Sequence, residues 1–429
     1  MTDKGIGAEA HRLIERLYPI NRSLTGDGVR ASLAIVREHA PFEVHEVATG
    51  TPVLDWTVPQ EWNVREAWIA GPDGRRLVDV DDHSLHLMGY SVPFRGRMPL
   101  GELREHLHTL PDQSDRIPYR TSYYAARWGF CLRHADLESW PDGVYEVCVD
   151  TTLADGHLTY GELVLPGRDR DEVLLHAHVC HPSLANDNLS SVALVTLMAR
   201  ELAQRPHRLS YRIVLLPGTI GAITWLARTE ATVRDITAGL VLAGTGDAGP
   251  VTYKRSRQGA ATVDRAVELV LRESGAPHAI EEFSPWGYDE RQYGSPGFDL
   301  PVGCLMRTPH GRYPEYHTSG DDLTLVRPAA LADTYEVLRG VLAVLEGEAR
   351  YRNLSPKGEP QLGRRGLYGS LGGAADKREA ELALLWVLNQ SDGHAALLDI
   401  AERSGVPFAQ LRHAADVLLD HDLLAPSSG

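Results

Sequence analysis

The sequence predicts an α/β protein with a mostly parallel sheet covered by helices, a β-rich insertion and a small helical C-terminal domain. Three observations support this fold class. Residues 161–350 alternate between strand and helix patterns, and residues 43–149 contain short β-type runs separated by turn signals. Beyond a Gly- and Pro-rich linker at 351–373, the chain ends in three short helical patterns.

The N-terminal forty residues predict two helices. Residues 8–18 carry apolar side chains at helical spacing, and residues 21–40 predict a loop capped into a second helix. Ser23 and Thr25 are the candidate N-caps, because their hydroxyls can accept hydrogen bonds from the first N–H groups of that helix.

The next segment has a different texture. Turn signals at 71–74 and 141–143 separate its short β-type runs, which indicates a β-rich insertion. Its histidines lack clustered carboxylates and are interpreted as polar loop or packed residues: His83, His86, His106 and His108. The unusually aromatic run at 117–130 forms either one wall of a pocket or the insertion's own core.

Residues 161–350 follow the pattern of successive βαβ units, which predicts a mostly parallel sheet covered on both faces. The candidate strands are 172–179, 211–217, 238–244, 278–283 and 301–306. The candidate helices are 188–204, 220–229, 260–274 and 327–347.

The C-terminal patterns indicate a helix-turn-helix or small winged-helix domain. Its helices are predicted at 377–389, 394–404 and 407–420, with a hairpin at 420–426. The presumed recognition helix and its end place Arg412 and His413 against three acidic residues, Asp416, Asp420 and Asp422. Since duplex binding needs a positive surface, a role in protein interaction or packing is favoured.

Composition narrows the function classes. The 429-residue chain has a net charge of −15, which argues against nucleic-acid binding as its main function. Its four scattered cysteines indicate neither a disulfide framework nor a zinc ribbon. It shows no secretory signal and no apolar run of membrane length, so we expect a cytoplasmic protein without membrane association.

Residues 174–188 (LLHAHVCHPSLANDN) carry the first candidate site. An apolar run leads to His178, Cys180 and His181, and Asp187 follows just before a helical pattern. In open α/β sheets, ligands bind outside the carboxyl ends of the strands, where these side chains would lie. Imidazole and carboxylate together suit Zn²⁺ or a similar divalent ion. The alternative is that both histidines are ordinary surface loop residues.

Three further segments place reactive side chains at predicted strand ends. They are LAGTGD with Asp247, WGYDERQY with Asp289, Glu290 and Arg291, and MRTPHGRYPEYHTSGDD with Arg307, Glu315 and His317. A strand-end His, a helix-start Asp and a later loop His recur together in zinc hydrolases, where a nearby carboxylate acts as general base. The two arginines could bind a substrate carboxylate, and the alternative for each is a surface salt bridge.

Several segments also carry a family resemblance. HVCHPSLANDN, YRIVLLPGTIGAI and YHTSGDD resemble, in this order, the co-catalytic zinc aminopeptidases. More closely, NRSLTGDGVR, IPYRTSYYAARWGFC, YDERQYGSPGFDLPV and RYPEYHTSGDDL resemble a bacterial family of polysaccharide-biosynthesis proteins with an aminopeptidase-like domain. The resemblance covers most of residues 20–350. It implies an aminopeptidase-like core at 1–42 and 156–350, a β-rich inserted domain at 43–155, and a linker with a winged-helix domain at 351–429.

The resemblance also implies a ligand set. Asp187 matches the metal-binding Asp of the aminopeptidases, and His317 matches their last histidine ligand. The first histidine is either His178, at the strand end as in the peptidases, or His181, within the CHPS signature of the nearer family. His181 is preferred and both are kept. Asp247 lies a few residues late for the third metal Asp and is a further candidate.

The sequence departs from the peptidases at their Glu-Glu pair, which supplies the general base and one metal ligand. The nearer family keeps the first Glu, reading PETIG, whereas this chain has Pro217, Gly218 and Thr219. The lost ligand leaves one zinc ion at most, and a lost general base typically costs about 10²–10⁴-fold in rate. A carboxylate from elsewhere (Asp289, Glu290 or Glu315) or a group of the substrate could replace it.

We therefore expect a zinc-dependent, aminopeptidase-like hydrolase acting on an amide or aminoacyl group in a biosynthetic pathway. One Zn²⁺ would be bound by the ligand set above, Asp289 or Glu290 would move protons, and Arg291 and Arg307, with Glu315, would bind a small-molecule, aminoacyl or peptide substrate. Two alternatives stay open: a non-catalytic ligand-binding protein with a degenerate metal site, and a metal-dependent acyl transferase. The tail alone supports a third, a transcriptional regulator. A homo-oligomer is compatible with the sequence.

Overall fold

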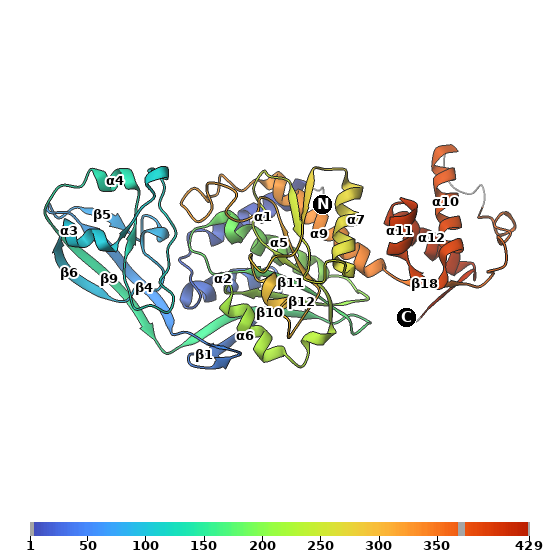
Figure 1. The fold of residues 1–429 in the computed structure, drawn as a ribbon, viewed down its shortest axis with the longest axis horizontal. Coiled ribbons are helices and arrows are strands. Elements are labelled where there is room, and N and C mark those ends of the chain that lie inside the picture. Colours follow the sequence, from blue (N-terminus) through green and yellow to red (C-terminus); the bar gives the residue numbers. More distant parts are fainter. Residues whose placement is uncertain (1–3, 368–373, 428–429) are drawn as a thin grey trace. The chain divides into compact units, whose positions relative to one another are not determined.

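The computed structural model describes residues 4–367 and 374–427, which form two compact units. The first unit comprises residues up to 261 together with 277–336, and the second comprises 262–276 together with 337 onward. Figure 1 shows the first unit as a large sheet with helices and an added β-rich part. Among the described residues, no helix is both long enough and apolar enough to span a membrane.

An eight-stranded mixed sheet, counted over the described residues, forms the core of the first unit, in the order β1-β10-β12-β11-β13-β16-β14-β15. β12, β11, β13 and β16 run parallel, while β1, β10 and β14 introduce antiparallel pairings. This confirms the predicted fold class. The bounds are β1 Glu43–Ala48, β10 His157–Leu165, β11 Glu172–His178, β12 Ser210–Leu216, β13 Ile236–Leu242, β14 Val251–Lys254, β15 His278–Glu281 and β16 Val302–Met306.

The burial of the central strand β11 explains why a strand forms at the apolar run seen in the sequence. All seven of its residues are buried, as expected for a parallel strand covered on both faces. Each fully buried leucine there contributes about 1.5–3 kcal/mol relative to an exposed one. The strand ends at His178, so the burial of β11 fixes the position of the first candidate ligand.

Helices pack on this sheet: α2 contacts β10, and α5 contacts β11. The main helices of the first unit are α1 Lys4–Leu17, α2 Asp27–Arg37, α5 Ser191–Leu202 and α6 Ile220–Thr229, and α9 Pro328–Gly347 begins in it. The predicted N-caps of α2 are wrong, because its N-cap is Gly26 without a side-chain bond. The Thr25 hydroxyl instead lies 2.7 Å from that of Tyr90 and accepts the Trp62 N–H.

The inserted part is built on a four-stranded antiparallel sheet in the order β5-β4-β9-β6. β1, which begins where we expected the insertion to start, belongs to the main sheet instead. The bounds are β4 Glu61–Ala70, β5 Arg76–Asp79, β6 Phe94–Pro99 and β9 Val144–Ala154, with short pieces at β2 Pro52–Val53, β3 Trp56–Thr57, β7 Leu107–His108, β8 Phe130–Cys131, α3 Leu100–Leu103 and α4 His134–Glu138.

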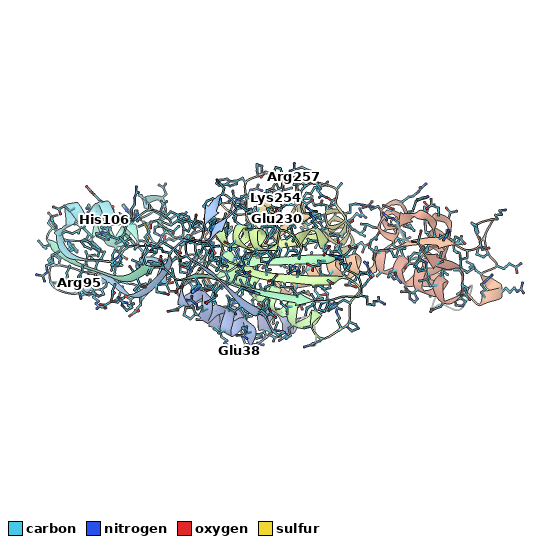
Figure 2. All side chains as sticks on the ribbon, turned by 90° about the horizontal axis from the view of Figure 1, so that it is seen from below. Glu38, Arg95, His106, Glu230, Lys254 and Arg257 are labelled. Carbon is cyan, nitrogen blue, oxygen red and sulfur yellow. The ribbon has the colours of Figure 1, made fainter. Side chains whose placement is uncertain are left out.

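The histidines of the insertion pack against its backbone. His86 Nδ1 lies 2.7 Å from the Cys131 carbonyl oxygen, and His106 Nδ1 lies 3.1 Å from that of Trp128. His106, labelled in Figure 2, also stacks on the Trp128 ring at 3.7 Å. These contacts support the interpretation of His86 and His106 as packed residues.

The second unit combines helices with a small sheet of order β18-β17-β19. The predicted terminal hairpin is wrong: β19 pairs with β17, whose sequence lies far upstream, and not with an adjacent strand. Part of the predicted linker, residues 368–373, lies outside the described residues. The bounds are α7 Thr262–Ser274, β17 Arg350–Asn353, α10 Ala374–Gln390, β18 Asp392–Ala396, α11 Leu397–Ser404, α12 Phe408–Asp420 and β19 Leu424–Pro426.

Candidate metal centre

The candidate site lies where parallel strands end. β11 ends at His178, β12 leads into Pro217 and Gly218, and β13 and β16 end at Leu242 and Met306. Because these four strands run parallel, their carboxyl ends meet at one edge of the sheet. This is the edge at which open α/β sheets bind their ligands.

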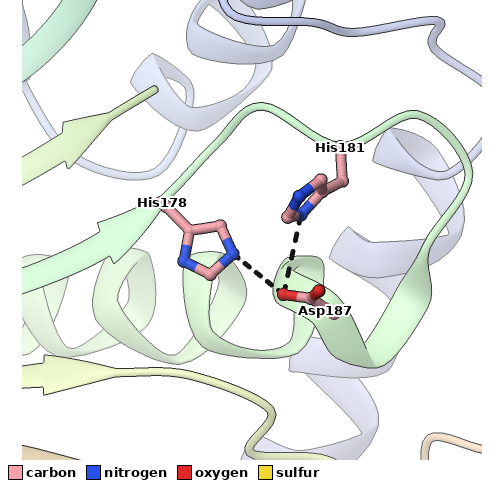
Figure 3. Close-up of side chains that lie close together, drawn as sticks. All are labelled: His178, His181 and Asp187. Atoms are coloured by element: carbon pink, nitrogen blue, oxygen red, sulfur yellow. Dashed lines mark hydrogen bonds and ion pairs between the residues drawn. The ribbon is translucent and has the colours of Figure 1, made fainter. Parts of the chain in front are cut away.

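Three imidazoles surround the fully buried carboxylate of Asp187. His178 Nε2 lies 2.9 Å from Asp187 Oδ1, and His181 Nδ1 lies 3.6 Å from the same oxygen (Figure 3). His317 Nε2 lies 3.0 Å from the other oxygen, Oδ2. The structure therefore brings together four of the five predicted metal ligands.

The backbone around Asp187 is fixed by a second carboxyl group. Asp187 lies in the irregular segment Ala185–Ser190 that leads into α5. Asp321 accepts hydrogen bonds from the N–H groups of Asn186 at 2.6 Å and Asp187 at 2.9 Å. Burial raises the pKa of Asp321 to about 8, although these donors oppose the shift. Asp321 thus fixes the backbone that carries the candidate ligand Asp187.

Asp187 is ionised in this environment. Burial alone would raise its pKa, but the electrostatic effect of nearby His181 and the hydrogen bonds from His178 and His317 hold it well below its usual value. A buried carboxylate requires a compensating positive charge, which either protonated imidazole or a metal ion can supply.

The proton position on His178 follows from its neighbour Asn188. The Asn188 amide nitrogen donates to the Leu242 carbonyl, and its oxygen accepts the Gly244 N–H, so the orientation of this amide is determined. The same nitrogen donates to His178 Nδ1 at 3.1 Å. In the neutral ring the proton therefore lies on Nε2, which donates to Asp187.

His181 differs because its buried Nδ1 has no hydrogen-bond partner among the described residues. The candidate ligand atoms of His178, His181 and Asp187 lie within 4.8 Å of one another. Two ligands of a tetrahedral zinc ion at bond lengths near 2.1 Å are about 3.4 Å apart. The distances from the Asp187 oxygens to His181 Nδ1, 3.6 Å, and to His317 Nε2, 3.0 Å, bracket this value. The donor set and the unpaired nitrogen therefore fit a zinc ion.

A further carboxyl group, Asp289, approaches from the N-terminus of the short helix α8 Glu290–Tyr293. It is buried and accepts the Thr219 N–H at 3.1 Å, and its other oxygen lies 3.6 Å from His176 Nε2. Burial raises the pKa of Asp289 to about 6. Asp289 thus lies next to Gly218, where the peptidases are expected to carry their first Glu.

Glu290 is engaged elsewhere. Its Oε1 accepts a hydrogen bond from Lys254 Nζ at 2.8 Å, and Lys254 also donates to the Trp286 carbonyl. Both partners are buried, and Lys254 is labelled in Figure 2. Glu290 therefore neutralises a buried ammonium through Oε1, while its buried Oε2 has no hydrogen-bond partner among the described residues.

Three other predicted site residues are held by structural contacts. Arg307 donates to the Gly249 and Ala330 carbonyls and to Thr334, and Glu315 pairs with Arg116 at 3.1 Å. Both oxygens of Asp247 accept hydrogen bonds, from Asn186, Gly249 and Thr308. None of these contacts involves the imidazoles around Asp187.

Arg291 is the exception among the predicted substrate-binding residues. No carboxylate pairs with it among the described residues, and its buried Nε has no partner. Its charge lowers the pKa of Asp289, against the larger effect of burial, so it lies near that carboxyl group.

Tyrosines that the sequence reasoning did not single out cover the imidazoles. Tyr288 stacks on His178 at 5.3 Å, Tyr316 stacks on His317 at 4.0 Å, and Tyr119 meets His181 and His317 edge-on at 5.1 and 5.0 Å. Tyr288 and Tyr316 directly precede Asp289 and His317 in the sequence, and this adjacency to predicted site residues could have identified them. Tyr119 comes from the aromatic run of the insertion, so that run provides one wall of the site.

The fold and the strand-end site define an aminopeptidase-like α/β protein. Two solved structures share this fold. A zinc aminopeptidase from Bacillus subtilis is 13% identical, and the match covers 79% of this chain and 95% of that one with a TM-score of 0.59. An aminopeptidase from Aneurinibacillus sp. strain AM-1 is 12% identical, and the match covers 79% of this chain and 93% of that one with a TM-score of 0.52. At these identities the likeness shows the fold alone.

Closer relatives define the family. Residues 11–348 match the family described as a domain of unknown function, DUF4910, and residues 349–426 match a winged helix-turn-helix model. The chain belongs to the DUF4910 family. A Clostridium acetobutylicum protein, named as a polysaccharide biosynthesis protein with an aminopeptidase-like domain, is 48% identical over 418 residues, 97% of this chain and 96% of that one. A crystal structure from that organism, of a protein classed as a peptidase, is 46% identical with a TM-score of 0.94, covering 99% and 97%.

Proposed function

We propose that this protein is a cytoplasmic enzyme that uses one zinc ion to hydrolyse an amide or aminoacyl bond in a biosynthetic pathway. One observation carries the proposal: an ionised, fully buried Asp187 lies among three imidazoles, one of which has a buried nitrogen without a hydrogen bond among the described residues. Histidine and aspartate ligands of this kind are typical of zinc sites, and the carboxyl ends of parallel strands are where α/β sheets bind ligands, which supports the proposal.

His181, Asp187 and His317 would hold the zinc ion. Metal-binding histidines usually donate their second ring N–H to an acceptor, whereas His178 Nδ1 faces the N–H donor of Asn188. We therefore assign His178 to orienting the Asp187 carboxylate. A zinc ion held there would supply Lewis-acid polarisation of a carbonyl and activation of water for hydrolysis.

Asp289 would serve as general base. With a pKa of about 6 it is ionised at neutral pH, and it can both accept a proton and return it to a leaving amine. The Thr219 N–H holds one of its oxygens in place. Arg291, next in the sequence but one, would bind an anionic group of a small-molecule, aminoacyl or peptide substrate.

Gly218 supports one alternative, a non-catalytic protein that binds such a ligand at a degenerate site. Metal content together with turnover separates the two functions. An Asp289→Asn variant that keeps its zinc and loses hydrolysis of aminoacyl p-nitroanilides favours the enzyme, whereas absence of turnover in the zinc-loaded wild type favours the binding protein.

Elemental analysis of the zinc-reconstituted full chain tests the metal site. We expect about one zinc per chain in the wild type and far less in Asp187→Ala and His317→Ala. Glu315→Gln is the matched control, because it alters a predicted site carboxylate that pairs with Arg116 and should leave zinc in place. A wild-type chain that holds no zinc after reconstitution refutes the proposal.

A further inference from the structure

Large aromatic side chains of the insertion stand in solvent. Trp56 is 45% exposed, Tyr123 39% and Tyr124 57%. The Trp56 and Tyr124 rings lie 6.0 Å apart, although one comes from strand β3 and the other from the loop after residue 121. We call these three residues the aromatic platform. Neighbouring exposed aromatic rings are a candidate binding surface.

The platform is continuous with the candidate metal centre through Tyr119. Tyr119 and Tyr123 lie close enough for each phenol to influence the pKa of the other. Tyr119 in turn meets His181 and His317 edge-on, and its N–H donates to the His317 carbonyl at 2.8 Å. A ligand that reaches from the metal centre past Tyr119 therefore arrives at the platform.

The backbone under the platform is strained. Tyr123 has φ +43° and Tyr90 has φ +63°, values that non-glycine residues rarely adopt. The two rings lie 6.5 Å apart, and the Tyr90 hydroxyl is fixed by Thr25 and by the Gln60 carbonyl. Such strain persists only where the surroundings impose it, and it concentrates at ligand sites.

We propose that the platform binds the saccharide part of a substrate whose amide bond lies at the metal centre. This proposal rests on the proposed function and names its substrate class: an amino sugar carrying an N-acyl or N-aminoacyl group. A pyranose ring offers one apolar C–H face to an aromatic ring while its hydroxyls stay hydrated, so it suits rings that are about half exposed. An apolar amino-acid side chain would instead require an enclosed pocket.

The test uses N,N′-diacetylchitobiose as the probe, with binding to the full chain followed by saturation-transfer NMR. Trp56→Ala and Tyr124→Ala remove exposed rings without opening the core. Val144→Ala is the matched control, since Val144 is a 55% exposed apolar residue of the same insertion, on β9. Trialanine is measured under the same conditions as the competing ligand class.

We expect saturation of the sugar C–H protons in the wild type, binding weakened about 2- to 10-fold in each ring variant, and no change in the control. The proposal is overturned if the disaccharide fails to bind at about 10 mM, if the ring variants bind like the wild type, or if trialanine alone binds in a Trp56-dependent way. Zinc is quantified in the same samples. If the disaccharide binds a zinc-free chain in a Trp56-dependent way, the saccharide proposal holds and the proposed function fails. If the protein shows zinc-dependent turnover but does not bind the disaccharide, the proposed function holds and the saccharide proposal fails.

Discussion

Exchanging His178 and His181 for glutamine separates a metal ligand from a positioning residue. The Asn188 amide donates to His178 Nδ1, which leaves the His178 proton on the nitrogen that faces Asp187. Glutamine can reproduce that donor, so His178→Gln should keep zinc with an affinity about 10- to 100-fold lower, as for other residues that orient a ligand. His181→Gln removes the unpaired nitrogen itself and should abolish stoichiometric binding.

These affinities translate into stability. Zinc at about 1,000 times its Kd stabilises the wild-type fold by about 4.1 kcal/mol, and a 10- to 100-fold weaker site retains about 1.4–2.7 kcal/mol at the same zinc concentration. His181→Gln should gain nothing. Denaturant unfolding with and without zinc measures all three values. The second unit contains none of these residues, so its unfolding transition serves as the internal reference.

The opposite pattern would refute the assignment. If His181→Gln is stabilised by zinc like the wild type while His178→Gln is not, the ring of His178 must bind the metal through Nε2. In that case the hydrogen bond from Asn188 does not determine the protonation state of the zinc-bound protein.

Two further predictions concern buried carboxyl groups. Burial raises the pKa of Glu348 to about 7, so the folded state holds this proton more tightly than the unfolded chain, and the stability contributed by Glu348 falls as pH rises from about 4.5 to 7. Glu348→Gln keeps an acceptor for the Leu398 N–H. In urea unfolding, the variant should stabilise the second unit relative to the wild type by about 1–3 kcal/mol above pH 7, but not at pH 4. A variant whose stability equals that of the wild type at both pH values contradicts this prediction. For Asp289, whose pKa is raised to about 6 by burial, the ionised form is the base, so kcat/KM should fall about tenfold per pH unit below pH 6. Asp289→Asn should lose about 10²–10⁴-fold in turnover with unchanged zinc content, and an unaltered rate would exclude this role.

The parts of the fold that could be predicted are those encoded by local patterns. β11 and α5 follow from a continuous apolar run and a helical period, and together they set the spacing between His178 and Asp187. The predictions fail where a contact with a residue distant in the sequence determines the local structure. Thr25 looks like an N-cap in the sequence, but its oxygen bonds to Tyr90 and Trp62 of the insertion. β19 pairs with β17 and not with its sequence neighbour, which no local pattern reveals.

The same distinction holds for the candidate site. A strand-end position can be read from the sequence, but the polar groups that satisfy a side chain there cannot. Asp247 and Arg307 both follow strands, yet Thr308 and Thr334 satisfy them away from the imidazoles. Tyr119 reaches His317 across almost 200 residues, so its place in the site depends on how the insertion docks on the core.

The changes at the lost Glu-Glu pair are structurally consistent with one another. The Gly218 N–H donates to Cys180 Sγ, and a Cβ at residue 218 would come within 3.2 Å of that sulfur, so the thiol occupies the space beside this turn. Asp289 reaches the same turn from α8 and accepts the Thr219 N–H. Burying a carboxyl group with a pKa near 6 costs about 3 kcal/mol of folding free energy at neutral pH. The carboxyl group with this unfavourable burial lies beside the imidazoles, where a proton acceptor is useful. Its presence there favours a catalytic site with an altered general base over a site that has lost its activity.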